Sequence, residues 1–170
     1  MAIYKFEKAV VWLDGTSLAG HVSEIELPEI NWESVDHESL GFLGTPQHAT
    51  KVEAMECTIT WADYSPELAA AAADPYTRRQ LQIRAVFGKY EAGSKVADVL
   101  GRFTIAGRFM SNSLGSFSAT EYERESMMAV DYVKEEHDGV SMFEFSVEPP
   151  ILRANGGENV FAAIRDLLGV

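Results

Sequence analysis

Apolar and polar residues alternate strictly over residues 55–61 of the chain. One face takes every odd position and the other every even position: Met55, Cys57, Ile59 and Trp61 against Glu56, Thr58 and Thr60. A period of two that is rich in β-branched and aromatic residues predicts a half-buried strand. One dry face and one wet face are typical of an antiparallel sheet that faces water on one side.

Two long segments change phase part-way along. Upstream of Met55 the apolar positions move to Val52 and Ala54, which predicts a bulge or bend near Ala54. Residues 22–37 form a second long strand, whose phase slips at Pro28. If the two slips face each other in a hairpin, its midpoint lies near Gly41, inside a segment (38–46) with turn chemistry throughout.

The remaining pattern predicts a mainly β chain with two helices. Ser65, Pro66 and Glu67 are typical of a helix start, and the segment 158–168 has the apolar stripe of a C-terminal helix. The second long strand starts at Ser17 and reaches Leu27 before its slip. The other expected strands are 9–13, 81–87, 99–110, 120–133 and 142–147, with turn-rich residues at 88–94. We therefore expect an α+β fold dominated by an antiparallel sheet, as a sandwich or a barrel.

Composition limits the alternatives. The chain has 170 residues, of which 46% are hydrophobic, and we expect one domain over residues 1–170. The formal net charge of −12 argues against a protein that grips a phosphate backbone. We expect no membrane-spanning segment and no signal peptide, and hence a chain that is made and folded in a cytoplasm. The single Cys57 excludes an internal disulfide.

The sequence shows no pattern of catalytic or cofactor-binding residues. The four histidines lack metal-ligand spacing, although His37 and His48 could meet across the expected hairpin. No phosphate-binding glycine loop or nucleophile elbow occurs. We therefore expect no catalytic residues, no metal and no cofactor, and we interpret the chain as a non-enzymatic protein.

Several ordered segments together resemble the major tail tube protein of contractile-tailed bacteriophages and tailocins. They span nearly the whole chain: VVWLDGTSLAGHVSEIELPEI from Val10, the glycine-rich loop 41–46, VEAMECTITW, DYVKEEHDG, and NGGENVFAAIRDLLGV at the end. No single motif is specific, but the ordered set is. Where the family often has tyrosine and a glycine triplet, residues 37–40 here are HESL.

The resemblance implies a subunit that contributes four long strands to a hexameric, 24-stranded barrel. Rings of this kind stack into a tube inside a contractile sheath of the virion. At a strand spacing of ~4.8 Å and a tilt of ~40°, the bore is ~35 Å wide, enough for duplex DNA. The implied partners are further copies of the chain, the sheath protein, the tape-measure, baseplate and terminator proteins, and double-stranded DNA that passes without specific binding.

The longest alternating segments are the best candidates for tube strands, namely 22–37, 50–62, 99–110 and 120–133. Their polar positions are the expected lumen-lining residues: Glu29, Asn31, Glu33, Glu56, Thr58, Thr60, Arg102, Thr104, Arg108, Glu121, Glu123, Glu125 and Asp131. Seven acids against two arginines give −5 per subunit. We hypothesise that an acidic bore repels DNA phosphates and lets the genome slide.

Apolar and glycine residues outside these strands are candidates for contacts between stacked rings. The expected residues are Leu40, Gly41, Phe42, Leu43, Gly44, Pro46, Gly156 and Gly157. The loop tip could instead fold back onto its own core. Two other functions stay open: the tube of a tailocin or injection system without DNA cargo, and a monomeric ligand-binding sandwich.

Overall fold

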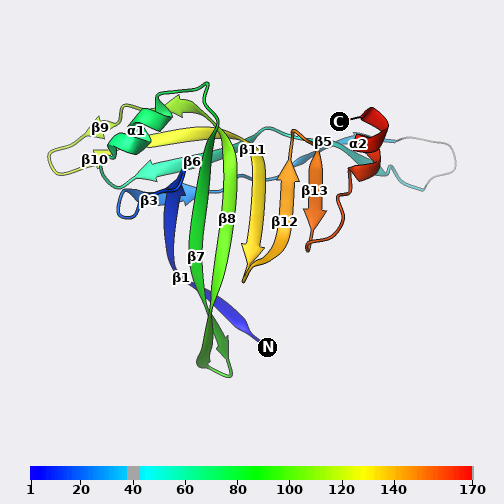
Figure 1. The fold of residues 1–170 in the computed structure, drawn as a ribbon, viewed down its shortest axis with the longest axis horizontal. Helices are drawn as coiled ribbons and strands as arrows, with labels where there is room; N and C mark the ends of the chain where they lie inside the picture. The colour runs from blue at the N-terminus through cyan, green and yellow to red at the C-terminus, as the bar shows by residue number, and fades with distance from the viewer. Residues whose placement is uncertain (38–42, 170) are drawn as a thin grey trace.

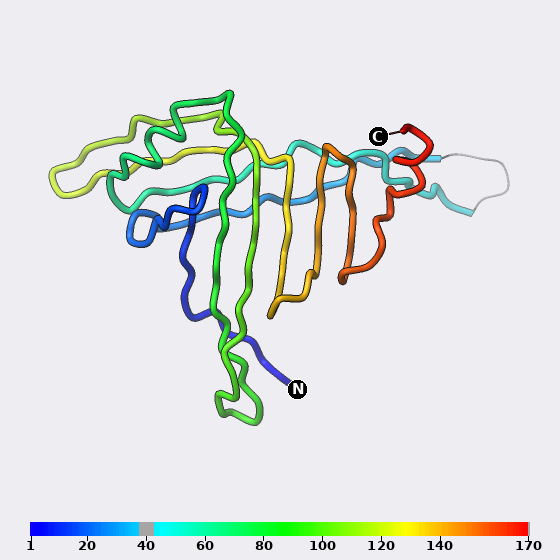
Figure 2. Tube along the Cα trace, viewed as in Figure 1, coloured from blue at the N-terminus to red at the C-terminus, as the bar shows by residue number. Residues whose placement is uncertain are grey.

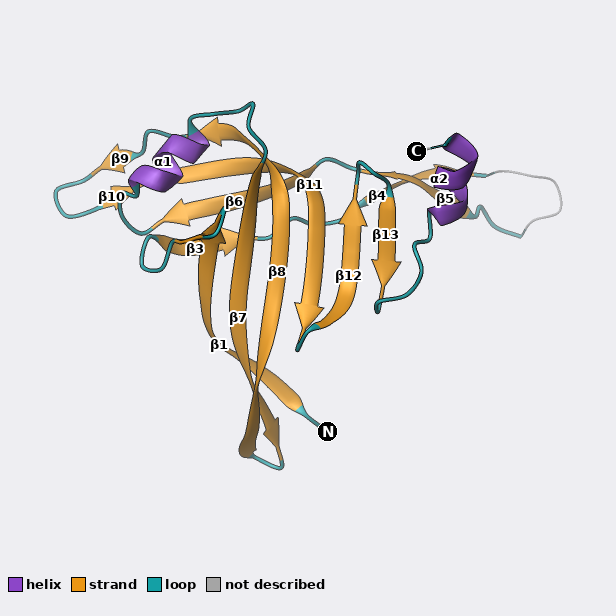
Figure 3. Cartoon of the chain, viewed as in Figure 1, coloured by secondary structure: helices purple, strands orange, loops and turns teal. Residues whose placement is uncertain are grey.

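The computed structural model describes residues 1–37 and 43–169, and in this part of the chain the expected mainly β, antiparallel architecture is confirmed (Figure 1, Figure 3). Two short helices accompany the strands, α1 (Pro66–Ala72) and α2 (Ala162–Leu168). The strands are β1 (Ile3–Leu13), β2 (Thr16–Ser17), β3 (Val22–Glu26), β4 (Trp32–Asp36), β5 (Gln47–Val52), β6 (Met55–Trp61), β7 (Arg79–Glu91), β8 (Ser94–Asn112), β9 (Ser116–Phe117), β10 (Tyr122–Glu123), β11 (Glu125–His137), β12 (Val140–Ser146) and β13 (Ile151–Ala154).

Most strands belong to one long sheet, in the order β13-β12-β11-β8-β7-β1-β2. Each neighbouring pair is antiparallel, and tight turns join β7 to β8 and β11 to β12. Asp138 and Gly139 both have positive φ at the second of these turns, as the Asp-Gly signal predicts. The β7–β8 hairpin runs far beyond the body of the molecule (Figure 2).

A second, four-stranded layer crosses the long sheet, and we call it the cross sheet. It has the order β3-β6-β11-β8, using only residues 125–130 of β11 and 107–112 of β8. β11 therefore leaves β6 and joins β12 part-way along its length, and the register shifts between Val130 and Tyr132 at this point. Gly107 permits the close approach there, because a Cβ atom would overlap the carbonyl oxygen of Ala129.

The hydrophobic core fills the space between the two layers. Cys57 and Ile59 of β6 are fully buried against Leu81 of β7 and Ile105 of β8, and Phe109 is 1% exposed. Helix α1 closes one side of the core with Leu68, which is also fully buried. The Ser65 hydroxyl accepts a hydrogen bond from the Leu68 amide, so the predicted helix start is confirmed.

The two predicted phase slips do face each other. β3 pairs with β6, β4 pairs with β5, and both strands are interrupted at the same level, at residues 27–31 and 53–54. The amide of Glu53 donates to the carbonyl of Asn31 across this gap. Trp32 pairs with Val52: Val52 packs against the core, and Trp32, which is 37% exposed, contacts the ring of buried Phe145 at a centroid distance of 6.3 Å. The hairpin therefore bends at the slip while both side chains keep contact with the core.

Several predicted boundaries were wrong. β7 continues to Glu91, and the expected turn at 88–94 narrows to Ala92 and Gly93, because pairing with β1 and β8 extends the hairpin. The C-terminal helix begins at Ala162 instead of 158. The Asn159 side chain binds the Leu152 amide and the Pro150 carbonyl, and these bonds hold the preceding residues against β13.

Candidate functional site

The outward face of the cross sheet carries the main cluster of polar residues predicted from sequence. The strand register sets them in three rows that cross the sheet: Glu24, Thr60 and Glu125; Glu26, Thr58, Met127 and Ser111; Glu56, Ala129 and Arg108. Four glutamates and one arginine give this face a formal charge of −3. Alternation along β6 puts Glu56, Thr58 and Thr60 here and the core residues beneath them.

The acidic face lies directly over a dry interior. Cys57 lies between Glu56 and Thr58 in the sequence, but its side chain points to the opposite side of the sheet and is fully buried. Burial, with a smaller contribution from the charge of Glu26, raises the pKa of the Cys57 thiol to about 12. The residue therefore acts as a small core hydrophobe, as its place in the alternating pattern predicts.

Five of the predicted lumen-lining residues come together on this face: Glu56, Thr58, Thr60, Arg108 and Glu125. Sequence reasoning missed Glu24, Glu26, Met127, Ala129 and Ser111 as members of the same surface. The signal for Glu24 and Glu26 was present, since they alternate with the apolar Ile25 and Leu27. The expected lumen-lining residues of this strand come only from the part after Pro28, so Glu24 and Glu26 are left out.

Other predicted residues lie away from this face. Glu29 and Asn31 are exposed in the link between β3 and β4, and Glu33 of β4 forms an ion pair with Lys51 at 3.3 Å. Arg102 and Thr104 lie on the long sheet, where Arg102 approaches Glu136 at 3.8 Å. Arg102 and Thr104 lie there because β8 is long: its first part belongs to the long sheet, and only its last part belongs to the cross sheet.

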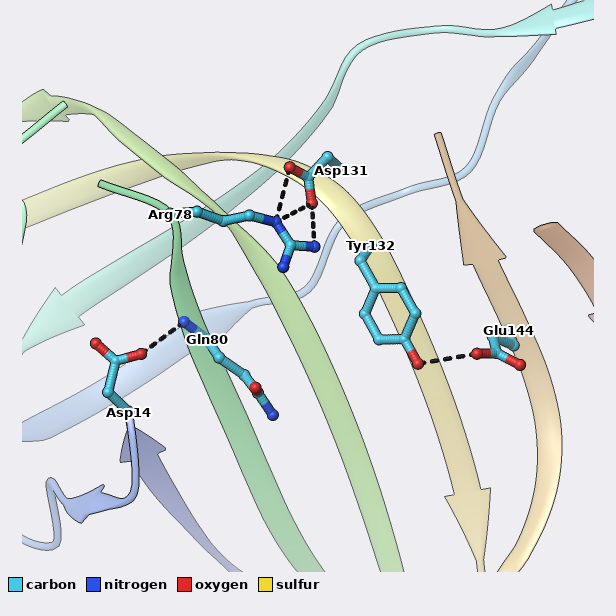
Figure 4. A network of polar contacts seen from close by, with 6 residues as sticks. All are labelled: Asp14, Arg78, Gln80, Asp131, Tyr132 and Glu144. Carbon is cyan, nitrogen blue, oxygen red and sulfur yellow. Dashed lines mark hydrogen bonds and ion pairs between the residues drawn. The ribbon is translucent and has the colours of Figure 1, made fainter. Parts of the chain in front are cut away.

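Glu121, Glu123 and Asp131 also take separate positions. Glu121 and Glu123 are exposed at the β9–β10 hairpin, at one end of the molecule. Asp131 lies where β11 passes between the sheets, and Arg78 donates to both of its carboxylate oxygens at 2.7–3.1 Å (Figure 4). The bonded carboxylate raises the pKa of Arg78 above its ordinary value.

The residues expected to contact other rings fall partly outside the described chain: this applies to Leu40, Gly41 and Phe42. Leu43 is fully exposed next to Gly44 and Pro46, at the far end of the β4–β5 hairpin. Gly156 and Gly157 are exposed in the turn after β13, where Gly156 has a φ of +66°. Both of these places are at the opposite end of the molecule from the β9–β10 hairpin (Figure 1).

The family model described as phage tail tube protein FII matches residues 4–169. The chain belongs to this family. It is a structural tail tube protein. No curated protein matches the sequence.

Solved structures agree with the tail tube fold. The sheath/tube terminator of an extracellular contractile injection system, PVC, in its extended state is 12% identical, with a TM-score of 0.59; 76% of this chain and 93% of that chain are covered. A chain in the structure of the sheath–tube complex of the same kind of system, also in its extended state, is 12% identical, with a TM-score of 0.58; 76% of this chain and 88% of that chain are covered. At this identity the likeness establishes the fold alone.

Both outer strands of the cross sheet in this tail tube protein lack a second strand partner within the described residues. There, β3 pairs only with β6, and β8 beyond Gly107 pairs only with β11. Because the four strands alternate in direction, β3 and β8 run antiparallel to each other. The two edges of such a sheet present unpaired backbone N–H and C=O groups, and the β8 edge of one copy can pair with the β3 edge of another copy as antiparallel strands.

The described residues contain no group of three or more histidine, cysteine, aspartate or glutamate side chains placed to hold a metal ion. Over the same residues, no helix is long and apolar enough to cross a membrane.

Proposed function

We propose that the chain forms hexameric rings in which the cross sheets join edge to edge into one 24-stranded barrel. The observation that carries this proposal is the pair of oppositely directed edges on β3 and β8, neither of which has a second strand partner in residues 1–37 and 43–169. When β8 of one copy lies beside β3 of the next, the contact is antiparallel, and an even number of alternating strands closes without a mismatch. Such a heterologous contact repeats around a ring.

In this ring the outward face of the cross sheet lines the bore. Its core-facing side is already covered by the long sheet, so only the side with Glu24, Glu26, Glu56 and Glu125 can face the lumen. A charge of −3 per copy gives −18 around six copies. This supports an acidic conduit through which double-stranded DNA moves without sticking, because like charges keep the phosphates away from the wall.

The long sheet then faces outward, toward the tail sheath. The two similar structures come from sheath, tube and terminator assemblies, which supports the sheath and terminator proteins as partners of this chain in a phage virion. Leu43, at the far end of the β4–β5 hairpin, and the turn at Gly156 and Gly157 after β13 lie at the same end of the molecule (Figure 1), and we place them at the contact between stacked rings. Tape-measure and baseplate proteins complete the set of partners at the tube ends.

Labelling of assembled tubes tests the lumen assignment. A Glu56→Cys variant introduces a thiol on the proposed bore, and the native Cys57 gives little background because it is buried with a raised pKa. Its tubes should react with a small biotin maleimide but should not bind streptavidin, which is wider than a ~35 Å bore. Arg84→Cys, on the outward side of the long sheet, is the matched control and should bind streptavidin. Streptavidin binding along intact Glu56→Cys tubes would contradict the proposal.

Charge reversal tests the role of the acidic wall. Glu26→Lys with Glu56→Lys changes the face from −3 to +1, and tubes of this variant should retain DNA at low salt and release it as salt rises. Glu29→Lys with Glu121→Lys makes the same charge change away from the cross sheet and is the control. Equal DNA retention by both variants would contradict a specific role of the bore.

The similar structures belong to an injection system, so a tube without DNA cargo is a second candidate function. Recovery of nuclease-protected DNA with purified tails that contain this chain would favour the phage tail. Its absence from contracted and uncontracted particles alike would favour the injection tube.

A further inference from the structure

The long sheet extends beyond the cross sheet that covers it. In Figure 1 its strands continue well past β3, the outer strand of the cross sheet. Near β3 the core-facing side chains are buried: Leu81 is 0% exposed and Ile83 4% exposed. Further along the same face of the neighbouring strand, Phe6 is 63% exposed. The buried face of the sandwich therefore continues into solvent.

Aromatic side chains line this continuation, and we call it the aromatic ledge: Phe6, Phe87, Phe103, His137 and Phe143. Phe6 is exposed, whereas the other four are half-buried, Phe103 and Phe143 against the core. They come from five adjacent strands of the long sheet, β1, β7, β8, β11 and β12. The register places Phe6 beside Phe87, and Phe103 and Phe143 on either side of Glu135. All these residues share the side of the sheet that carries Ile83 and Ile105.

The ledge is an ordered surface. The rings form a connected series, with centroid distances of 6.1 Å from Phe6 to Phe87, 5.9 Å from Phe87 to His137 and 6.4 Å from His137 to Phe103. Gly101 makes room for it, because a Cβ atom there would lie 2.7 Å from the Phe87 ring. His137 is held in place by Glu135 at 3.0 Å. The Phe6–Phe87 and His137–Phe103 contacts are edge-to-face, an arrangement that is favourable at these distances.

A hollow of about 660 Å³ adjoins the ledge. It is lined by Tyr4, Phe87, Ala97, Val99, His137 and Met142, together with the charged residues Lys89, Asp98 and Asp138. Tyr4 is 56% exposed and Met142 40% exposed, so the apolar surface is wider than the aromatic rings alone. Contiguous apolar surface of this kind marks an interaction site on a soluble protein.

We propose that the aromatic ledge packs against the neighbouring copy of the chain within the same ring. This rests on the proposed function, in which the next copy joins at the edge of β3. The ledge begins beyond the outer edge of β3 and lies on the side of the long sheet that the cross sheet covers (Figure 1). A copy that pairs with this edge of β3 therefore comes to lie against the ledge. The neighbour thus completes the core of the sandwich, and the ring is held by apolar burial as well as by backbone hydrogen bonds.

This arrangement explains why the long strands project so far from one subunit. A chain that stayed monomeric would expose Phe6, Tyr4 and the adjoining rings permanently, at the risk of aggregation. The sheath protein is a poorer match for the ledge, because the ledge is on the core-facing side and the sheath would lie over the opposite side. The opposite side carries charged residues, including Arg84, Arg102 and Lys134.

Ring assembly of a Phe6→Ser variant tests the proposal, with Ile3→Ser as the matched control. Both residues are exposed apolar side chains of β1, at 63% and 58%, but Ile3 points to the opposite face. Phe6→Ser should raise the concentration needed for rings at least tenfold in native mass spectrometry and sedimentation velocity. Ile3→Ser should leave that concentration unchanged. The melting temperature of the monomer should be the same for both, since neither side chain is buried in a single chain.

Alkylation provides a second measurement on the same positions. The thiol of Phe6→Cys should react readily in monomers and become protected in rings, whereas the thiol of Ile3→Cys should react in both. Rings that form normally with Phe6→Ser, or loss of only the stacking of rings, would overturn the ledge contact and leave the barrel intact. Failure of the unaltered chain to form any ring would instead overturn the proposed function.

Discussion

Arg78 and Asp131 meet through two nitrogens and two oxygens at the place where β11 passes from the cross sheet to the long sheet. The pair is partly exposed, with 50% of the arginine side chain and 36% of the aspartate side chain accessible, so solvent screens it. We expect Asp131→Asn to lower the free energy of unfolding by about 1 kcal/mol. Urea denaturation of Asp131→Asn, Arg78→Gln and the double variant forms a cycle. A double variant that loses the full sum of both single losses would show that the two side chains act independently.

Gly107→Ala should be the more damaging change at the same junction. The added Cβ would overlap the Ala129 carbonyl oxygen, which belongs to the neighbouring strand backbone and has little freedom to move. We expect a loss of about 2–3 kcal/mol in the free energy of unfolding. Gly44→Ala is the control, because nothing lies within 4 Å of a Cβ atom there. Similar denaturation midpoints for the two variants would contradict the close approach of β8 and β11.

Cys57 should be chemically silent in the native protein. Its thiol is fully buried and its pKa is raised to about 12, so the reactive thiolate is scarce at pH 8. A thiol reagent in excess should modify Cys57 only as fast as the protein unfolds, and urea should accelerate the reaction. Ser111→Cys, on the exposed face of the cross sheet, should react at once under the same conditions. Rapid modification of Cys57 in native protein would show that β6 opens locally.

Stability at high pH should depend on Tyr132. Its hydroxyl donates a hydrogen bond to Glu144 at 3.0 Å (Figure 4), and burial followed by this carboxylate raises the pKa of Tyr132 to about 12. A raised pKa in the folded state means that this contribution is complete below pH 10 and is lost as the pH rises toward 12. The stability difference between the unaltered chain and Tyr132→Phe should therefore narrow over that range in denaturant titrations.

The matched control for this pH dependence is Tyr76→Phe, because Tyr76 is 88% exposed. Its stability difference from the unaltered chain should not narrow over the same range, from pH 10 to 12. A constant difference for Tyr132→Phe as well would contradict the contact with Glu144.

Local pattern was sufficient to predict much of the fold. The alternation around Cys57 predicted β6, the Ser65 and Pro66 signal predicted α1, and the slips at Pro28 and Ala54 predicted the bent hairpin. These features depend on residues close in sequence. The C-terminal helix was predicted too long because the side-chain bonds of Asn159 compete with helix formation.

The candidate surface was predicted less well, for a topological reason. Polar residues at Arg102 and Arg108 have the same alternating pattern, yet β8 is long enough to serve two sheets, and the two side chains belong to different ones. Alternation shows which side of a strand is wet but does not show which sheet the strand has joined. Only the pairing of β11, first with β6 and then with β12, separates the two surfaces.

β11 is a single covalent strand of 13 residues that belongs to both layers of the molecule. A force on the inner wall of a tube would therefore travel to the outer layer through backbone bonds, without relying on side-chain packing to carry it. The same chain of bonds would resist shear between the layers when a surrounding structure contracts. β11 thus connects the two sheets covalently at the place where they cross.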